Sequence, residues 1–208
     1  MESKINAIIL AGGKNSRMQG EDKAFLEVGG KPIIERLIDK LRILVNEIII
    51  VTNSPEKYLN FEAKLVKDES PDKGPLMGIY SGLRASAAKH NFVLACDMPF
   101  VSEALIRYMI EDSDDFDIVI PEVNGKLHPL LGVYSKNCIP IIEEMLKQDE
   151  LRISNIFSRL KTRFISGQEA KKCDPALLSL ININTKEELE KVSRRKGLKL
   201  CQSSLLPS

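Results

Sequence analysis

The chain has 208 residues, 43% of them hydrophobic and 28% charged, which permits one sizeable core and is not typical of disordered, collagen-like or coiled-coil proteins. Its 30 basic and 29 acidic residues leave a net charge of +1, so there is no overall attraction to nucleic acid or to a membrane surface. The N-terminus does not have the pattern of a signal peptide, and no stretch approaches the roughly 20 apolar residues of a membrane helix. The cysteines form no CxxC pair. We therefore expect a cytoplasmic protein with reduced thiols.

Short apolar runs alternate with amphipathic segments over the first half of the chain. Ile5 to Leu10 is apolar without alternation, as expected of a parallel strand that is covered on both faces. Pro32 to Leu44 follows with apolar residues at helical spacing and proline at the first helical position. We then expect strands at 47–52 and 63–67, a helix at 76–89, a strand at 92–95, and a helix capped by Ser102 and ending near Ile110. This order predicts a parallel sheet with right-handed crossovers.

The pattern changes beyond Asp117. The segments DIVIP and LHPLLGVY are strand-like with little between them, which predicts a hairpin or a mixed region of the sheet. A helix at 139–146, a strand at 162–165 and a last helix starting at NTKEELEKV are expected next; in the last helix Thr185 and Glu188 have capping-box spacing. We expect a single domain over 1–193 and a loose tail over 194–208.

A segment rich in glycine and cations follows the first strand. Gly12 and Gly13 let backbone amides approach an anion closely, and Lys14, Arg17 and Lys23 supply positive charge. The segment contains neither the P-loop sequence G-x-x-x-x-G-K-[ST] nor the dinucleotide fingerprint G-x-G-x-x-G. It is therefore either a phosphate-binding loop of another kind or an ordinary turn with solvated cations.

Further polar residues follow the later predicted strands, at the edge where open α/β sheets bind ligands. Asp97, in VLACDMPF, can hold magnesium, which favours one or two carboxylates with substrate phosphates; alternatively it caps the turn before Pro99. Asp68 lies in KDESPDKGPLMG, which also reads as a surface loop. Asn182 and Asn184, in ININT, can serve as oxygen ligands or base-binding amides, or simply as turn residues.

Several other chemistries are disfavoured. His90 and His128 are the only histidines and HExxH is absent, so a histidine-rich metal site is excluded. No G-x-S-x-G marks a nucleophilic serine, and the lack of tryptophan argues against a base-stacking surface for single-stranded nucleic acid.

Five segments together resemble one protein family. LAGGKNSRMQGEDKAF, KDESPDKGPLMG, ACDMPFV, HPLLGVY and ININTKEEL occur in the order and rough spacing of the molybdenum cofactor guanylyltransferases, which are molybdopterin nucleotidyltransferases. The resemblance covers about residues 5–192. The L-A-G-G sequence fits the guanylyl branch better than the A-A-G of relatives that use CTP, although Gln19 stands where the family commonly has glycine. The fold that this resemblance implies is α/β, a Rossmann-like three-layer nucleotidyltransferase fold with a mostly parallel, mixed central sheet.

The resemblance also implies a reaction and a set of site residues. A terminal phosphate of the molybdenum cofactor (molybdopterin) would attack the α-phosphorus of GTP and expel pyrophosphate, with Mg²⁺ as cofactor. By matching position, the implied catalytic residues are Arg17, Lys23 and Asp97, with Asp97 as the metal ligand. The implied nucleotide-binding residues are Leu10, Ala11, Gly12, Gly13, Lys23, Asn53, Asp68 and Asp97. Candidates for the acceptor side are Gly78, Asn182 and Asn184.

The expected partners are the two substrates, GTP and the molybdenum cofactor, together with transient contact to cofactor-delivery proteins or apo-molybdoenzymes. No nucleic acid and no membrane partner is expected. The alternatives are a CTP-dependent molybdopterin cytidylyltransferase, a sugar-phosphate nucleotidyltransferase of the same fold, and a carrier that binds the cofactor without catalysis. The presence of both Lys23 and Asp97 argues against the carrier, which requires neither the cation nor the carboxylate.

Overall fold

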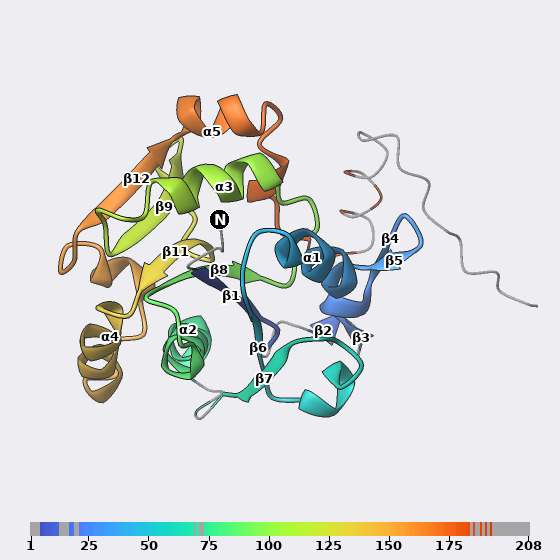
Figure 1. The fold of residues 1–208 in the computed structure, drawn as a ribbon, viewed down its shortest axis with the longest axis horizontal. Coiled ribbons are helices and arrows are strands. Elements are labelled where there is room, and N and C mark those ends of the chain that lie inside the picture. The colour runs from blue at the N-terminus through green and yellow to red at the C-terminus, as the bar shows by residue number, and fades with distance from the viewer. Residues whose placement is uncertain are drawn as a thin grey trace, which may run out of the picture.

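An eight-stranded sheet forms the centre of the molecule (Figure 1). The computed structural model describes residues 5–12, 17–18, 21–68, 70, 73–183, 185, 188, 190 and 192, with only the backbone for 17, 18 and 21. The strand order is β10-β9-β11-β8-β1-β6-β7, and β12 pairs with β9. The strands are β1 (Ile5–Leu10), β6 (Ile48–Thr52), β7 (Lys64–Lys67), β8 (His90–Ala95), β9 (Ile118–Val123), β10 (Lys126–Leu127), β11 (Leu131–Ser135) and β12 (Thr162–Ser166).

The sheet is mostly parallel, as predicted. Strand β1 pairs in parallel with β6 on one side and with β8 on the other, and β7 extends this parallel set beyond β6. Strand β11 runs antiparallel to both β8 and β9, which makes the sheet mixed from Asp117 onward. Every residue of β1, β6 and β8 is buried, which explains their largely apolar sequences; Asn6, His90 and Asn91 are buried polar exceptions.

Helices cover both faces of the sheet and complete the three layers (Figure 1). Helices α1 (Ile33–Arg42), α3 (Glu103–Glu111) and α5 (Gly167–Cys173) pack on one face, and α2 (Gly74–Ala85) and α4 (Cys138–Lys147) on the other. Along β1 the side chains alternate between the two cores, with Ile9 in the first and Ile8 in the second. Full burial of one such side chain stabilises the fold by about 1.5–3 kcal/mol.

The predicted helix at 76–89 differs most from the structure. Helix α2 begins at Gly74 and ends at Ala85, and Ser86 is extended with a ψ of 144°. The Ser86 hydroxyl accepts hydrogen bonds from Asn6 Nδ2 (3.0 Å) and from the backbone N of Ala88 (3.1 Å). These bonds compete with helix formation, so the following alanines leave the helix despite their high propensity, and β8 starts at His90.

Several short elements were not predicted. Two small hairpins are formed by β2 (Arg17–Met18) with β3 (Glu21–Asp22) and by β4 (Glu27–Val28) with β5 (Lys31–Pro32). The second turns at Gly29 and Gly30, whose φ values of 63° and 76° suit a type I′ turn. Pro32 consequently lies in β5 and caps α1 instead of being its first residue. The remaining short elements are the 3₁₀ turns η2 (Lys23–Phe25), η3 (Pro55–Tyr58), η5 (Ile153–Ile156) and η6 (Leu178–Leu180).

Two predicted helix caps have different outcomes. Glu188 N donates to Thr185 Oγ1 at 3.0 Å, which confirms that capping contact, although much of the segment 184–192 and all of the tail 194–208 lie outside the described residues. Ser102 does occupy the N-cap position of α3, but its hydroxyl donates to the carbonyl of Cys173 at 3.0 Å instead of capping the helix.

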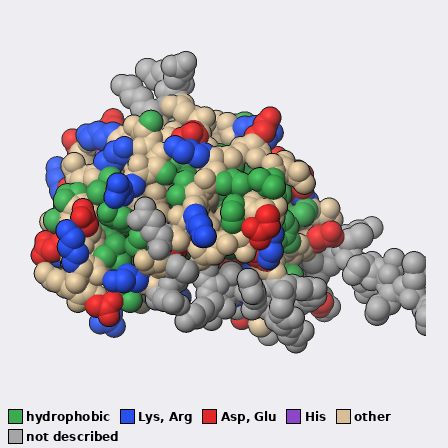
Figure 2. Space-filling model, turned by 90° about the horizontal axis from the view of Figure 1, so that it is seen from below, with side chains coloured by type: hydrophobic (Ala, Val, Ile, Leu, Met, Phe, Trp, Pro, Cys, Tyr) green, Lys and Arg blue, Asp and Glu red, His purple; other side chains and the backbone are tan. Residues whose placement is uncertain are grey.

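The surface is mixed in charge. On the face seen from below in Figure 1, lysine and arginine side chains are interspersed with aspartate and glutamate among apolar ones (Figure 2). This agrees with the near-balance of charge in the sequence. Among the described residues no helix is both long enough and apolar enough to cross a membrane.

Candidate active site

The carboxyl ends of four parallel strands, β7, β6, β1 and β8, lie next to one another at one edge of the sheet. A predicted site residue follows each of them: Asp68 after β7, Asn53 after β6, Ala11 after β1, and Asp97 two residues after β8. Ligands bind at this edge in open α/β sheets. The fold therefore brings together residues that are up to 86 positions apart, from 11 to 97.

The floor of the site is the end of β1. The backbone N of Ala11 donates to Val51 O (2.9 Å), and the backbone N of Cys96 donates to Leu10 O (3.1 Å), so neighbouring strands fix this backbone on both sides. Gly12 comes next and is exposed. Of the residues that follow, Gly13 and Lys14 lie outside the described part of the chain, as do the side chain of Arg17 and its predicted contacts.

Asn53 contributes an unpaired polar atom beside this floor. Asn53 lies next to Gly12: a Cβ added at Gly12 would be in ordinary van der Waals contact with Asn53 Nδ2, at 3.6 Å. Asn53 Oδ1 is buried and has no hydrogen-bond partner among the described residues. A buried acceptor without a partner costs about 1–3 kcal/mol, so a ligand that donates a hydrogen bond here gains that free energy.

Asp68 lies at the start of the loop that leads into α2, and Gly78 lies within the first half of that helix. Asp68 is 9% exposed, and its carboxylate accepts a hydrogen bond from the backbone N of Ser70 at 3.2 Å. Gly78 is buried, and a Cβ there would lie 3.1 Å from Leu10 Cδ2. A Cβ at Gly78 would thus press only on the end of a flexible side chain, and the assignment of this glycine to the acceptor side stays a prediction.

Lys23 lies in η2 and is only 6% exposed. The preceding Asp22 caps this turn by accepting from the backbone N of Ala24 at 3.2 Å. Its other carboxylate oxygen lies 3.4 Å from both Tyr58 Oη and Lys57 Nζ. The position of Lys23 is therefore tied to η3, more than 30 residues away, by a contact that no local sequence pattern reveals.

Asp97 contacts an amide and is within the electrostatic influence of a cation. Asn182 Nδ2 is 3.3 Å from each carboxylate oxygen of Asp97, and the backbone N of Ile183 donates to Asp97 O at 2.8 Å. Burial raises the pKa of Asp97 above its usual value, while the positive charge of Lys23 and the Asn182 hydrogen bond act in the opposite direction. Burial also raises the pKa of the neighbouring Cys96, so this thiol stays protonated and is not a nucleophile.

The donors around Asp97 fit a magnesium ion that arrives with a nucleotide. Magnesium in nucleotide sites is commonly held by one or two carboxylates plus substrate phosphates. Asp97 supplies the carboxylate, and the Nδ2 group of Asn182, which donates to that carboxylate, orients it without being a ligand itself. Within the described ranges no group of three or more histidine, cysteine, aspartate or glutamate side chains could hold a metal, so this part of the protein offers a partial ligand set.

The family model for the MobA-like NTP transferase domain matches residues 7–163. The chain belongs to this family. Among relatives, the molybdenum cofactor guanylyltransferase of Desulfosudis oleivorans is 39% identical and covers 90% of this chain and 93% of its own. The probable molybdenum cofactor guanylyltransferase of Natranaerobius thermophilus is 37% identical and covers 95% and 98%. The resemblance predicted from the sequence is thus confirmed.

Solved structures confirm the fold of this MobA-like protein. Molybdopterin-guanine dinucleotide biosynthesis protein A from Archaeoglobus fulgidus superposes with a TM-score of 0.78 at 24% identity, covering 92% of this chain and 98% of that one. A protein from Aquifex aeolicus reaches a TM-score of 0.72 at 31% identity, covering 88% and 96%. The predicted Rossmann-like nucleotidyltransferase architecture is therefore correct.

The structure brings together most of the predicted residues of this MobA-like domain. Leu10, Ala11, Gly12, Lys23, Asn53, Asp68, Asp97 and Asn182 lie at the carboxyl edge of the sheet or in segments packed against it. Gly13 and Asn184 lie outside the described residues. The sequence analysis missed Tyr58 and Asp22 as supports of Lys23; Asp22 was visible only as the neighbour of that lysine.

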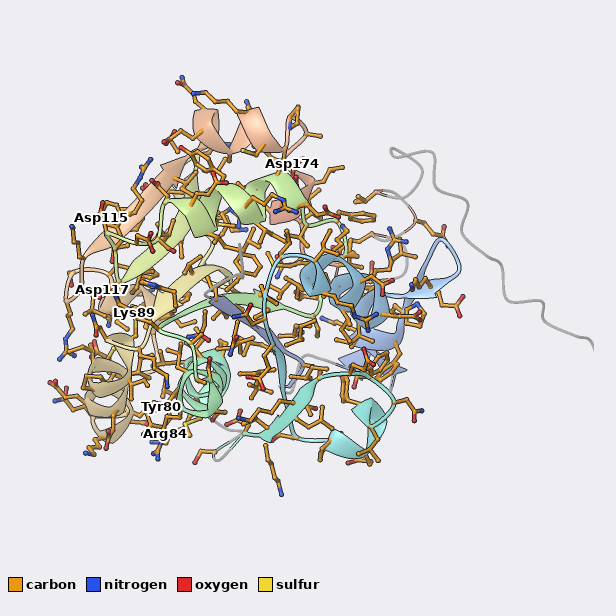
Figure 3. All side chains as sticks on the ribbon, viewed as in Figure 1. Tyr80, Arg84, Lys89, Asp115, Asp117 and Asp174 are labelled. Carbon is orange, nitrogen blue, oxygen red and sulfur yellow. The ribbon has the colours of Figure 1, made fainter. Side chains whose placement is uncertain are left out.

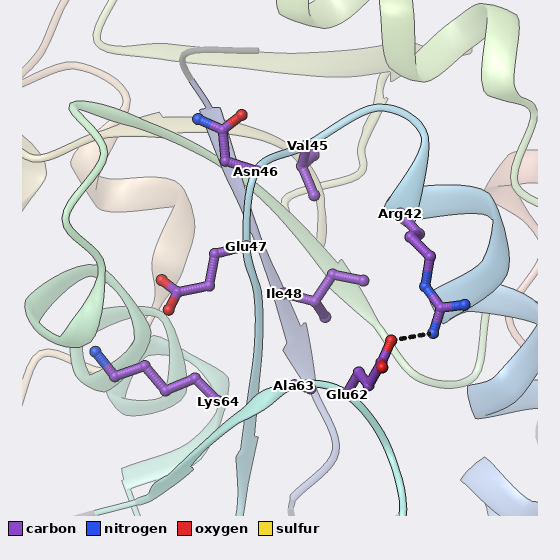
Figure 4. Close-up of a pocket in the computed structure, with 8 residues that line it drawn as sticks. All are labelled: Arg42, Val45, Asn46, Glu47, Ile48, Glu62, Ala63 and Lys64. Atoms are coloured by element: carbon purple, nitrogen blue, oxygen red, sulfur yellow. Dashed lines mark ion pairs between the residues drawn. The ribbon is translucent and has the colours of Figure 1, made fainter. Parts of the chain in front are cut away.

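A hollow in the surface lies at the opposite edge of the sheet, where β6 and β7 begin (Figure 4). Its charged side chains already have partners in the protein. Arg42 pairs with Glu62 at 3.1 Å, Glu47 accepts from Asn6 at 3.1 Å, and Lys64 donates to the carbonyl of Ala85 at 2.6 Å. These contacts provide no argument for a ligand there, in contrast to Asn53 at the carboxyl edge.

Proposed function

We propose that this protein transfers GMP from GTP to the terminal phosphate of the molybdenum cofactor, releases pyrophosphate and forms the guanine dinucleotide cofactor. The observation that carries the proposal is Asp97 at the carboxyl edge of the sheet, where Asn182 contacts its carboxylate and the positive charge of Lys23 acts on it. The names of the two relatives from D. oleivorans and N. thermophilus, each matching at least 90% of this chain, support guanylyl transfer over the CTP and sugar-phosphate alternatives.

The nucleotide would lie across the ends of β1, β6 and β7. Leu10 to Gly13 would cradle it, and the unpaired Oδ1 of Asn53 would accept a hydrogen bond from its base or sugar. Asp68 would accept another at the neighbouring strand end. Arg17 and Lys23 would contact the phosphates, where a charge-assisted hydrogen bond contributes about twice as much as a neutral one.

The reaction exchanges one phosphorus–oxygen bond for another. An oxygen of the cofactor's terminal phosphate forms a bond to the α-phosphorus of GTP, and the bond from that phosphorus to the bridging oxygen breaks, leaving the electron pair on pyrophosphate. The attacking phosphate is already anionic at neutral pH, so no general base is needed. The chain's task is to position both substrates and to stabilise charge, with Lys23 facing the accumulating negative charge.

Asp97 would hold the magnesium ion at this site, and the Nδ2 group of Asn182 would orient its carboxylate. When bound, the ion supplies neutralisation of the charge on the phosphate oxygens. Asn182 and Asn184 would lie on the acceptor side, next to the reacting phosphate. We further propose a cytoplasmic location and transient contact with proteins that deliver the cofactor or receive the product.

Asp97→Ala tests this proposal. With GTP labelled at the α-phosphorus, the wild type should place the label in the dinucleotide product, whereas label at the γ-phosphorus should leave with pyrophosphate. The variant should lose at least about 100-fold in transfer rate, as expected when one preorganised electrostatic group is removed. Its circular dichroism spectrum and melting temperature should stay close to those of the wild type.

Glu62→Ala is the matched control, because it removes an 86% exposed carboxylate at the opposite edge of the sheet. Its transfer rate should equal that of the wild type. Full activity of Asp97→Ala would refute the metal assignment, and γ-label in the product would refute nucleotidyl transfer itself.

A further inference from the structure

Two segments that are distant in the sequence run side by side beneath the candidate site. One is the segment 97–102 between β8 and α3, and the other is the segment 179–183. At one end the backbone N of Ile183 donates to Asp97 O at 2.8 Å. At the other end the backbone N of Ser102 donates to Ser179 Oγ at 2.8 Å. The alignment of Asn182 with Asp97 therefore depends on both ends.

Ser179 is in turn held by a buried carboxylate. Asp174 Oδ2 accepts from the backbone N of Ser179 at 2.7 Å and from its hydroxyl at 2.6 Å. Asp174 is 8% exposed and Ser179 is fully buried. Figure 3 shows Asp174 beside the N-terminal end of α3, where Ser102 lies. The Ser179 hydroxyl thus donates to one partner and accepts from the other, which joins Asp174 to Ser102.

The backbone between Asp174 and Ser179 is held in an unusual conformation. Leu177 has a φ of 51°, in the left-handed region that a bulky side chain disfavours. The backbone N of Leu177 donates to Asp174 O at 2.8 Å, and η6 starts directly after it. Such conformations persist only where surrounding contacts fix them, so the Asp174 bonds determine the course of the chain toward Asn182.

The lengths of the hydrogen bonds indicate which contacts hold the segment 179–183 in place. Asn182 Nδ2 lies 3.3 Å from both oxygens of Asp97, longer than the usual 2.7–3.2 Å range for such bonds. The bonds of Asp174 to Ser179 are shorter, at 2.7 and 2.6 Å, which makes them the stronger set. The side-chain contact at Asp97 therefore does not hold the segment in place; the bonds of Asp174 to Ser179 at one end and of Ile183 N to Asp97 O at the other do.

We propose that Asp174 and Ser179 are positioning residues that hold Asn182 against Asp97 and so set the affinity of the site for its divalent cation. Neither residue touches the substrate or the ion. Asp174 acts on Ser179, Ser179 fixes the segment 179–183 on Ser102, and that segment presents the Asn182 amide to the carboxylate. This inference rests on the proposed function, because it assumes that Asp97 binds the cation.

The test follows the concentration of Mn²⁺ that half-saturates binding of a fluorescent GTP analogue, which needs no catalytic turnover. Ser179→Ala removes the hydroxyl bridge and should raise this concentration 5- to 10-fold, and Asn182→Ala should raise it similarly. In the double variant the effects should not multiply, because Ser179 acts through Asn182. Ser113→Ala is the matched control: it removes a buried hydroxyl that donates to Ile110 O at 2.6 Å, and it should leave the Mn²⁺ dependence unchanged.

Two results would overturn the inference: an unchanged Mn²⁺ dependence in Ser179→Ala, or an equal factor from this substitution with and without the Asn182 side chain. If Ser179→Ala does not fold, Asp174→Asn serves in its place, since it keeps the shape and weakens the charged bonds. Asp97→Ala separates this inference from the proposed function. An unchanged Mn²⁺ dependence in Asp97→Ala refutes the metal assignment, whereas loss of that dependence together with unaffected Ser179→Ala refutes the positioning role alone.

Discussion

At the scale of single residues, the electrostatics of the candidate site centre on Lys23. A lysine that is 6% exposed must have its charge compensated; Asp22 caps its turn, and the Asp97 carboxylate is close enough for the two charges to act on each other. Asp22 also contacts Tyr58, whose pKa is raised by burial, so its hydroxyl stays a donor to that carboxylate at neutral pH. The lysine is thereby held in place before any phosphate arrives.

Lys23→Ala should weaken binding of GTP by about 10- to 100-fold, the equivalent of one charge-assisted hydrogen bond to a phosphate. Turnover should fall as well, because the same charge faces the departing pyrophosphate. Calorimetry with GTP and a pyrophosphate-release assay measure the two effects. Lys147→Ala removes a 72% exposed lysine on α4 and should change neither. Wild-type binding and turnover in Lys23→Ala would show that the opening segment is an ordinary turn.

At the scale of elements, the site depends on how closely α2 packs against β1, because this packing fixes the position of the end of β1, which carries Leu10. Two glycines of α2 make the approach possible. A Cβ at Gly82 would lie 2.5 Å from Ile8 Cγ2, a branched side chain with little freedom, whereas a Cβ at Gly78 would lie 3.1 Å from the end of the flexible Leu10. A side chain at Gly82 would therefore push α2 away from β1, whereas a small side chain at Gly78 can be accommodated.

Gly82→Ala should lower the free energy of unfolding by about 1–3 kcal/mol, since overpacking outweighs the better helix propensity of alanine. Gly78→Ala should change it by less than about 1 kcal/mol, because Leu10 can move. Urea denaturation of both variants measures the difference. Equal stabilities would show that α2 shifts freely on the sheet. A loss of transfer in a stable Gly78→Ala protein would support the predicted place of Gly78 on the acceptor side.

At the scale of the whole molecule, the succession of the main strands and helices along the chain was predictable, because each of them has its own local pattern of apolar residues. Uninterrupted apolar runs such as Ile5 to Leu10 are typical of strands with helices on both faces, and these gave the parallel sheet with its antiparallel insertion after Asp117. The same rule placed Asp68 and Asp97 just beyond strand ends, since the carboxyl ends of parallel strands share one edge, whereas Asn53 was implied by the family resemblance alone.

The contacts that were not predictable are those whose partners lie far apart in the sequence. The bond of Ser86 to Asn6 ends α2 early, across 80 positions, and no local propensity reports it. The hydrogen bond from Ser102 N to Ser179 Oγ spans 77 positions and fixes the course of the segment that leads to Asn182, and no local propensity reports it either. Helix α5 was missed for another reason: its capping box, Ser166 with Glu169, was visible in the sequence, but the helix has only seven residues and little periodicity.

The account's central claim is that the carboxyl edge of the sheet is a GTP site whose cation is held by Asp97. Calorimetric titration of the wild type and of Asp97→Ala with GTP, CTP and ATP, each with and without Mg²⁺, tests it most directly. We expect GTP to bind the wild type at least about 10-fold more tightly than CTP or ATP, a difference of about 1.4 kcal/mol in binding free energy, and only with Mg²⁺ present. In Asp97→Ala, Mg²⁺ should no longer strengthen the binding of GTP, which should be equally weak with and without the ion. Preferential binding of CTP, or Mg²⁺-dependent GTP binding that Asp97→Ala retains in full, would contradict the account.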